Sequence, residues 1–269
     1  MPTTTRQPAI YIPHGGGPWP FVDIPFIPAG SLEPLAHYLR TLVTSLETRP
    51  DALLVVSAHW EEPVVTVMTG LHPPMLYDYT GFAPEAYRLE WPAPGAPALA
   101  ERVTSLLGGA GFRTATNATR GFDHGTFVPL MLALPDADIP ILQVSLINTL
   151  DAAEHIALGR ALAPLRDEGV LLVGSGNSYH NMRGFGHIAS TEPSRQFDAW
   201  LADAVCQPPA ERERLLGDWE LAPAARHCHP REEHLLPLHV MLGAGLGDAA
   251  TLPFRMEALR THASAVQFG

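Results

Sequence analysis

The sequence contains no lysine and only two cysteines, and both shortages exclude classes of protein. Arginine supplies every cationic side chain, and 17 arginines against 28 acidic residues give a formal net charge of −11. This balance argues against a nucleic acid or an anionic membrane as a partner, because both bind basic patches. A chain without lysine also cannot carry a P-loop, whose lysine contacts the phosphates of a bound nucleotide.

The two cysteines, Cys206 and Cys228, form no CxxC pair. A disulfide framework or a thiolate zinc site is therefore not expected, and a reducing cytoplasm is the predicted location. The apolar stretch near the N-terminus is too short for a signal peptide or a membrane span. With 46% hydrophobic and 17% charged residues over 269 positions, the composition is that of a globular protein with one sizeable core.

Apolar strand-like runs alternate with helical patterns along the chain. Strands are predicted near residues 9–13, 53–59, 64–69, 112–118, 138–146 and 170–173. Helices are predicted near 31–47, 96–108, 127–134, 150–165, 194–206 and 208–226, and in a segment ending at Gly243. This alternation predicts a single α/β domain over residues 1–269, with a central mixed or mostly parallel sheet flanked by helices.

Three of these apolar strands each lead into a histidine, namely His14, His59 and His180. In open α/β sheets, sites form at the carboxyl ends of the strands, so we predict a metal site there. Neutral imidazole is a ligand for zinc, copper, iron and nickel. The sequence has no HEXXH pair, and His229 and His234 are five residues apart, which places them on different faces of a helix. Ligands must therefore come from distant segments.

Five short motifs, spread from residue 14 to residue 238, resemble one family in their type and order. They are HGGGP at 14–18, SAHWE at 57–61, FDHGTFVPL at 122–130, GSGNSYHN at 174–181 and HPREEHLLPL at 229–238. Together they resemble the class III extradiol ring-cleavage dioxygenases, and within these the DOPA-dioxygenase type. The resemblance implies a non-haem Fe(II) enzyme that opens a small aromatic diol, a catechol, with O₂. Zinc could replace the iron in a protein handled in air.

The resemblance also implies roles for individual histidines. His14, His59 and His234 correspond to the metal ligands. His180 corresponds to the acid and base of the reaction, which is sometimes counted as a fourth ligand, and histidine is the side chain most often used for general acid and base catalysis. His124 corresponds to a pocket histidine that contacts substrate or oxygen. The structural alternative for His124 is a capping residue in a polar turn at 119–126.

Several assignments stay open at this point. Glu232 or Glu233 could supply a carboxylate ligand, although acids that open a helix are often solvated. His227 and His229 are expected beside the site or on the surface. Arg120, Arg183 or Arg231 could bind a substrate carboxylate. Aromatic residues in two long loops could wall a pocket, namely Trp19, Phe21, Tyr77, Tyr79, Phe82 and Trp91.

Two other functions compete with ring cleavage. The same three histidines could hold zinc in a hydrolase, with metal-bound water as the nucleophile. The chain could also be a non-enzymatic metal-binding relative, although such a protein would be expected to lack the pocket histidines His124 and His180. Gly15, Gly16 and Gly17 do not form a dinucleotide-binding GxGxxG motif, and we interpret them as room for the backbone beside the metal.

Overall fold

In the computed structural model, three of the four parallel strands at the centre of one sheet lead to His14, His59 and His180 at the same edge. The structure describes residues 6–25 and 27–269. Residues 1–5, which belong to the N-terminal stretch considered above, and Phe26, which belongs to the loop after Gly17, lie outside the described residues.

The sheet has eight strands in the order β4-β3-β5-β2-β6-β1-β8-β7 over the described residues. The central strands β5, β2, β6 and β1 are parallel, whereas β3 pairs antiparallel with β5 and β8 pairs antiparallel with both β1 and β7. The bounds are β1 Ala9–Pro13, β2 Ala52–Glu62, β3 Val65–Met68, β4 Thr114–Asn117, β5 Ile141–Ile147, β6 Val170–Gly176, β7 Ala250–Ala258 and β8 Thr261–Phe268. The predicted mixed, mostly parallel α/β sheet is confirmed.

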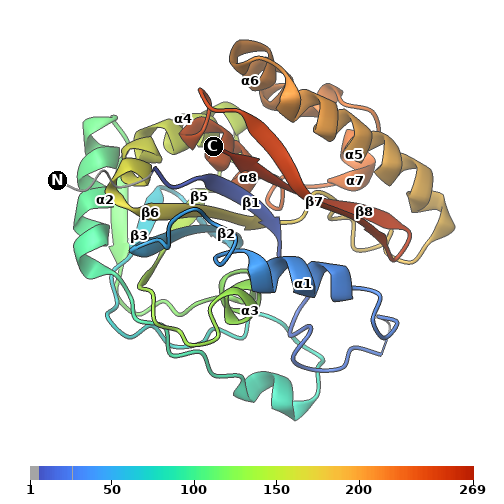
Figure 1. Ribbon diagram of the computed structural model, residues 1–269, viewed down its shortest axis with the longest axis horizontal. Coiled ribbons are helices and arrows are strands. Elements are labelled where there is room, and N and C mark those ends of the chain that lie inside the picture. The colour runs from blue at the N-terminus through green and yellow to red at the C-terminus, as the bar shows by residue number, and fades with distance from the viewer. Residues whose placement is uncertain (1–5, 26) are drawn as a thin grey trace.

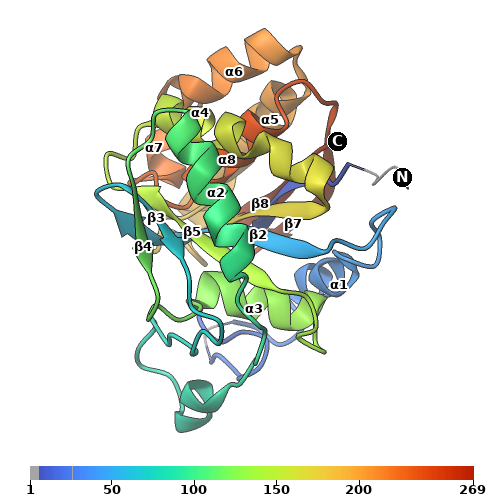
Figure 2. The same ribbon diagram turned by 90° about the vertical axis from the view of Figure 1, so that its left-hand side faces the viewer.

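Helices cover both faces of the sheet. Figure 1 shows α1 and α3 below it and α4, α5, α6 and α8 above it, while α2 stands at its left side and packs into the same core as α4 and α8. Figure 2 shows α2 crossing the front of the molecule. The α-helices are α1 Glu33–Thr41, α2 Pro97–Gly109, α3 His124–Ala133, α4 Ala152–Leu162, α5 Thr191–Cys206, α6 Pro209–Gly217, α7 Ala225–Cys228 and α8 Leu236–Ala244. Short 3-10 turns occupy Pro84–Arg88, Ala163–Glu168, Ile188–Ser190 and Trp219–Leu221.

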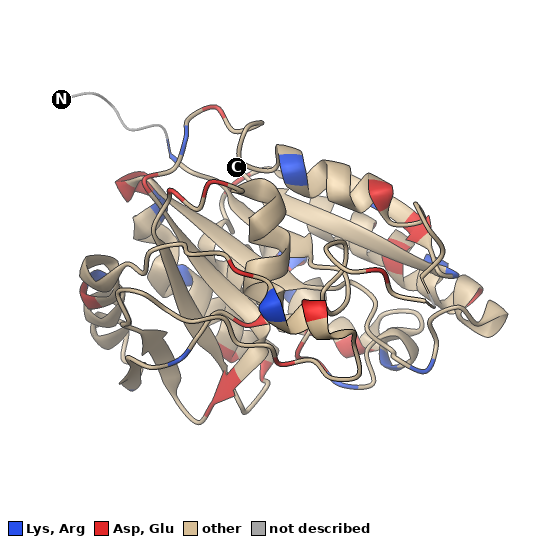
Figure 3. Cartoon of the chain, turned by 90° about the horizontal axis from the view of Figure 1, so that it is seen from below, with Lys and Arg blue, Asp and Glu red and all other residues tan. Residues whose placement is uncertain are grey.

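The hydrophobic runs of the central strands are explained by burial on both faces. In β2, Leu54 and Val56 belong to the core under α2, α4 and α8, whereas Leu53 and Val55 belong to the core over α1 and α3. Successive side chains of a strand point to opposite faces, so a strand covered on both sides must be apolar throughout. Charged residues are correspondingly concentrated on the outer helices and loops, while the central strands carry few (Figure 3).

The structure corrects several boundaries. The helix predicted over 31–47 ends at Thr41, and helix α3 begins at His124, inside the segment predicted as a polar turn. The segment 208–226 divides into α6, a 3-10 turn and the start of α7. Strands β7 and β8 were not predicted, because their hairpin turns at Leu259 and Arg260 without the Gly or Asn that usually marks such a turn. Within the described residues, no helix combines the length and apolarity needed to cross a bilayer.

Candidate metal centre

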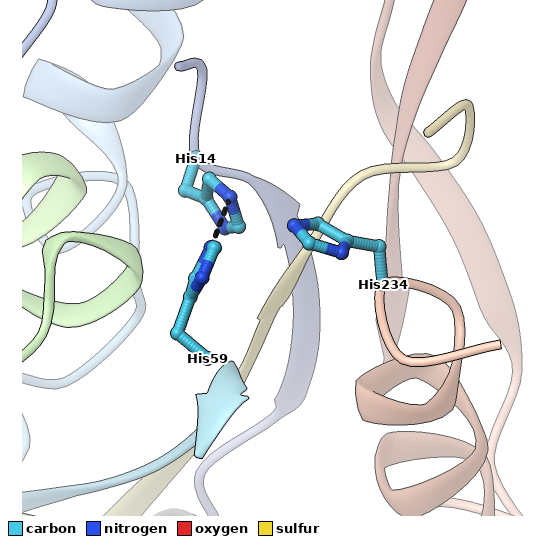
Figure 4. A group of neighbouring side chains, drawn as sticks. All are labelled: His14, His59 and His234. Atoms are coloured by element: carbon cyan, nitrogen blue, oxygen red, sulfur yellow. Dashed lines mark hydrogen bonds between the residues drawn. The ribbon is translucent and has the colours of Figure 1, made fainter. Parts of the chain in front are cut away.

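The side chains of His14, His59 and His234 meet at the carboxyl edge of the sheet (Figure 4). The Nε2 atoms of His14 and His59 are 3.2 Å apart, and one ring nitrogen of each of the three residues lies within 4.8 Å of the others. With metal–nitrogen bonds of about 2.0–2.1 Å, neighbouring ligand nitrogens are separated by roughly 3.0–3.4 Å. The spacing of this group therefore fits one metal ion.

His14 follows the last residue of β1, and its tautomer is set by a buried serine. Ser175 of β6 donates its hydroxyl hydrogen to the carbonyl of Gly125, so its oxygen is left to accept from His14 Nδ1, 3.0 Å away. His14 Nε2 then carries the free lone pair. Asn177 Nδ2 also lies 3.2 Å from this Nε2, so the amide must shift when that lone pair binds an ion.

His59 lies on β2 at a point where the pairing with β5 changes register between Val56 and Glu61. Its Nδ1 faces Asp78 Oδ2 at 3.4 Å, which leaves Nε2 directed at His14. Burial, together with the neighbouring His124, lowers the pKa of His59 to about 4. The imidazole is therefore neutral near pH 7, which is the form that binds a metal.

His234 comes from the loop before α8 rather than from the sheet, and backbone contacts hold it in place. Its carbonyl accepts hydrogen bonds from the Tyr11 hydroxyl at 2.8 Å and from the backbone N–H of Asn177 at 3.1 Å. A Cβ at Gly176 would collide with that carbonyl oxygen. Gly176, at the end of β6, thus lets the loop that carries His234 approach the sheet closely. This close approach, rather than a sharp turn of the backbone, explains the glycine.

The Nε2 atom of His234 is buried and has no hydrogen-bond partner among the residues that the structure describes. Its Nδ1 lies 2.9 Å from Glu233 Oε1, so the hydrogen is on Nδ1 and the lone pair of Nε2 faces the other two histidines. An unpaired polar atom in a protein interior is costly unless it binds something. Burial lowers the pKa values of His14 and His234 well below the ordinary histidine value, which keeps both neutral. The three residues therefore fit a bound metal ion.

His180 lies beside this group, four residues after the end of β6. Its Nδ1 is 3.1 Å from Glu233 Oε1, the same oxygen that His234 contacts. Burial would raise the pKa of Glu233, but the hydrogen bonds from His180 and His234 outweigh it and hold the pKa below its usual value. Glu233 is thus an anion that orients two imidazoles. Because Nδ1 of His180 contacts Glu233, Nε2 is the ring nitrogen available for other contacts.

His124 is the first residue of α3, and Asp123 caps that helix by accepting from the Thr126 amide. Asp78 accepts from both the backbone amide of His124, at 2.9 Å, and its Nδ1, at 2.8 Å. Burial opposes the ionisation of Asp78, but these bonds outweigh it and lower its pKa. The ring of His124 lies 4.0 Å from that of His59 between centroids. His124 therefore stands next to the candidate ligands with its Nδ1 atom held by Asp78.

Two further groups of potential ligands overlap the first within the described residues, namely His59 with Asp78 and His124, and His180 with Glu233 and His234. In both, the carboxylate already accepts a hydrogen bond from a ring nitrogen. The three-histidine group is better suited to a metal, because no carboxylate contacts its Nε2 atoms in the described structure and the Asn177 side-chain amide, which can shift, is the group that lies on the Nε2 atom of His14.

A cavity of about 670 Å³ opens onto the site, and all five histidines line it: His14, His59, His124, His180 and His234. This volume falls in the range of small-molecule sites, which are commonly about 300–1,000 Å³. The arrangement offers a metal-binding group, two further imidazoles and room for a ring-sized ligand in one place.

Comparison with known proteins agrees with this geometry. The family described as the catalytic LigB subunit of aromatic ring-opening dioxygenase matches residues 8–266. The chain belongs to this family. The 4,5-DOPA dioxygenase extradiol of Portulaca grandiflora is 43% identical over 205 residues, which cover 73% of each chain. The protein of the same name from Escherichia coli K12 is 36% identical over 260 residues, covering 93% of this chain and 90% of the relative.

A solved structure gives the same result for the fold. The crystal structure of an uncharacterized protein from Escherichia coli K12 superposes with a TM-score of 0.77 at 32% identity, and covers 98% of this chain and 100% of that one. The predicted class, an extradiol ring-cleavage dioxygenase of the DOPA-dioxygenase type, is therefore confirmed for this LigB-family chain.

Other predicted pocket residues divide into those that reach the cavity and those that do not. Tyr79 and Phe82 line it, whereas Trp19, Phe21, Tyr77 and Trp91 are absent from its lining among the described residues. Gly15 and Gly17 have positive φ values, and a Cβ on either would collide with the ring of Trp19 or Phe82. These glycines make room for aromatic rings, which differs from the predicted room for backbone beside a metal.

Three of the remaining polar candidates, Arg120, Arg231 and His229, have structural partners within the described residues. Arg120 pairs with Asp123 at 2.9 Å and lies over the Trp60 ring, and Arg231 forms a two-pronged pair with Glu61. His229 is buried with Nε2 3.0 Å from the Ser178 carbonyl. Asp78 and Ser175 were missed by sequence reasoning, because a single acid or serine in a loop or strand carries no spacing signal.

Proposed function

We propose that this LigB-family protein is a non-haem Fe(II)-dependent extradiol dioxygenase that opens the ring of a catechol and incorporates both atoms of O₂. The observation that carries the proposal is the convergence of three imidazole lone pairs on a cavity that His124 and His180 also line. Family membership supports the reaction class.

His14, His59 and His234 would hold the metal. Bound Fe(II) would supply Lewis acidity that lowers the pKa values of the catechol hydroxyls and a redox centre for O₂ chemistry. Three neutral ligands leave the ion's charge uncompensated, so an anionic catecholate is favoured there. Glu233 and Ser175 would keep the ligand rings in the required tautomers, as carboxylates and other acceptors do for metal-bound histidines.

His180 would act as the acid and base. Its Nδ1 hydrogen is directed at Glu233, so Nε2 is free to accept a proton from the second ring hydroxyl. The adjacent anion favours the imidazolium that results, and this imidazolium can return the proton to a later intermediate. His124, held by Asp78 through Nδ1, would offer Nε2 to a substrate or oxygen atom in the cavity.

The test is anaerobic loading with Fe(II), addition of a panel of catechols and then of air, with O₂ uptake and the yellow ring-fission product as readouts. Stoichiometric O₂ uptake with at least one catechol is expected, and His180→Ala should remove it while metal content is retained. Failure with every catechol, combined with ester or amide hydrolysis by the Zn(II) protein, would favour a hydrolase instead. Metal binding without either reaction would favour a non-enzymatic role. The cytoplasmic location stays a prediction.

A further inference from the structure

The backbone of His59 lies where β2 leaves the regular ladders of the sheet. The register between β2 and β5 shifts between Val56 and Glu61, and the register between β2 and β6 ends at Ser57. In the described part of the chain His59 is therefore paired in neither register, although its side chain extends from β2 toward His14 (Figure 4). Irregularities of this kind are common beside active sites, where they re-aim a side chain.

Two side chains bind the backbone groups of His59 in place of a neighbouring strand. The His59 amide donates to Ser57 Oγ at 3.2 Å, and the His59 carbonyl accepts from Arg120 Nη2, also at 3.2 Å. Both of these side chains contact one carboxylate, because Ser57 Oγ donates to Asp123 Oδ1 at 2.7 Å and Arg120 Nη2 donates to Asp123 Oδ2 at 2.9 Å. A closed chain of hydrogen bonds thus runs from the amide of His59, through Asp123, back to its own carbonyl.

The carboxylate in the middle of this chain is fully buried. The side chain of Asp123 is 0% exposed, and it also accepts from Gln143 Nε2 on β5. A buried carboxylate is costly unless donors and a cation surround it. Arg120 supplies the cation, and its guanidinium lies 4.4 Å from the centre of the Trp60 ring. Arg120 therefore contacts both His59, through its carbonyl, and the next residue of β2.

These contacts differ from those of a substrate-binding arginine. Arg120 is not among the described residues that line the cavity, and its side chain is only 15% exposed. Its Nη2 atom is used by Asp123 and by the His59 carbonyl. The carboxylate-binding role considered for Arg120 from the sequence is therefore not supported, and its contacts are directed at the backbone of a candidate metal ligand.

We propose that Arg120 is a positioning residue for the metal site. Together with Asp123 and Ser57 it fixes the backbone of His59, and so fixes the direction in which His59 Nε2 meets a bound metal ion. The inference rests on the proposed function for the metal that the three histidines would hold. Opening the hydrogen-bonded chain on either side of Asp123 should weaken metal binding, because groups that orient a ligand typically contribute about 10- to 100-fold to metal affinity.

Arg120→Gln opens the chain at the carbonyl of His59. The Kd for Zn(II), measured by competition with a chelator, should rise about tenfold or more. Arg212→Gln is the matched control, because Arg212 is also buried, donates to two backbone carbonyls and lies over an aromatic ring. Its partners are Gln207, Asp248 and Phe268, which belong to no segment that carries a candidate ligand. The Kd of this control should stay within about twofold of the parent value.

The Co(II)-loaded proteins give a readout that a loss of stability alone would not change. The visible absorption bands of bound Co(II) depend on the geometry of its ligands. At full loading they should differ from those of the parent in Arg120→Gln and match them in Arg212→Gln. Parent-like bands and Zn(II) affinity in Arg120→Gln would overturn the proposal, and so would equal changes in the two variants.

Ser57→Ala opens the same chain at the amide of His59 by a smaller change, and it decides the question if Arg120→Gln does not fold. Ser264→Ala is its matched control, because Ser264 is a buried serine that donates to Asp198, a buried carboxylate paired with Arg255. The Kd for Zn(II) should rise about tenfold in Ser57→Ala and stay at the parent value in Ser264→Ala. Parent-like Zn(II) binding in Ser57→Ala would show that the chain does not position His59.

These measurements require no turnover, so the two possible failures are distinguishable. If the parent binds Zn(II) but its Fe(II) form opens no catechol, the proposed function fails, while the affinities still decide the role of Arg120. If catechols are opened and all four variants bind Zn(II) as the parent does, the inference about Arg120 fails and the proposed function stands.

Discussion

The imidazole rings of His180 and His234 are stacked, with centroids 3.2 Å apart and planes inclined by 14°. Both direct Nδ1 at one oxygen of Glu233. A candidate ligand and the candidate acid and base are thus oriented by a single carboxylate, so a change at Glu233 should affect metal binding and proton transfer together.

Glu233→Gln removes that negative charge while nearly preserving the shape of the side chain. We expect metal affinity to fall about 10- to 100-fold, as for other groups that orient metal ligands, and kcat to fall as well. Metal titration with a competing chelator and steady-state O₂ uptake would measure both. Glu232→Gln is the matched control, because Glu232 pairs with Arg226 at 2.6 Å on the outside of the same loop. Equal behaviour of the two variants would contradict the orienting role.

Replacing any one of His14, His59 or His234 by Ala should lower metal affinity by about a hundredfold or more, because an incomplete ligand set remains. Metal content after dialysis, measured by elemental analysis, gives the result. His180→Ala should keep its metal, and a change at the exposed His72, His72→Ala, serves as the control for general effects. Loss of metal from His180→Ala would instead make His180 a fourth ligand.

Gly15→Ala should destabilise the fold strongly. Gly15 has a φ of 81°, and a Cβ there would lie 2.7 Å from a ring carbon of Trp19. The left-handed conformation and the overpacking together predict a loss of about 2–4 kcal/mol in the free energy of unfolding. Gly16→Ala, where a Cβ would meet nothing within 4 Å, should stay within about 0.5 kcal/mol. Urea unfolding monitored by tryptophan fluorescence would separate them, and similar midpoints would refute the packing argument.

The buried His155, on α4, predicts a loss of stability in acid. Its Nδ1 donates to the Asp151 carbonyl at 2.7 Å, while Nε2 accepts from the Ile147 amide at 3.1 Å, so only the neutral ring satisfies both bonds. Burial lowers its pKa. As the pH falls, His155 is therefore protonated in the unfolded chain before it is protonated in the folded protein. Its stabilising contribution is complete above about pH 6.5 and declines as the pH falls below that value.

His155→Gln tests this sign. Urea unfolding at pH values of about 8, 6.5 and 5 should show the variant less stable than the parent at the highest pH, with the gap narrowing toward the lowest. His72→Gln, at an exposed position, should follow the parent at every pH. A gap for His155→Gln that is constant with pH would mean that His155 binds a proton equally in the folded and unfolded states.

The central strands, the order of the helices and the candidate residues could all be predicted from the sequence. An apolar run such as Val170–Val173 predicts a strand that is buried on both faces of a covered sheet. The motifs around His14, His59 and His234 are local patterns that can be recognised in the sequence alone. The β7–β8 hairpin could not be predicted, because Leu259 and Arg260 give no turn signal.

The sequence by itself identified the candidate residues for the chemistry, since residue type and apolar periodicity are properties of short segments. Only the tertiary structure decided how they act: that Glu233 orients two imidazoles, that Asp78 reaches His124 from a loop 46 residues away, and that arginines are absent from the lining of the described cavity. These relations join segments far apart in the chain. Their distances are fixed by how helices, loops and sheet pack, and no local pattern encodes them.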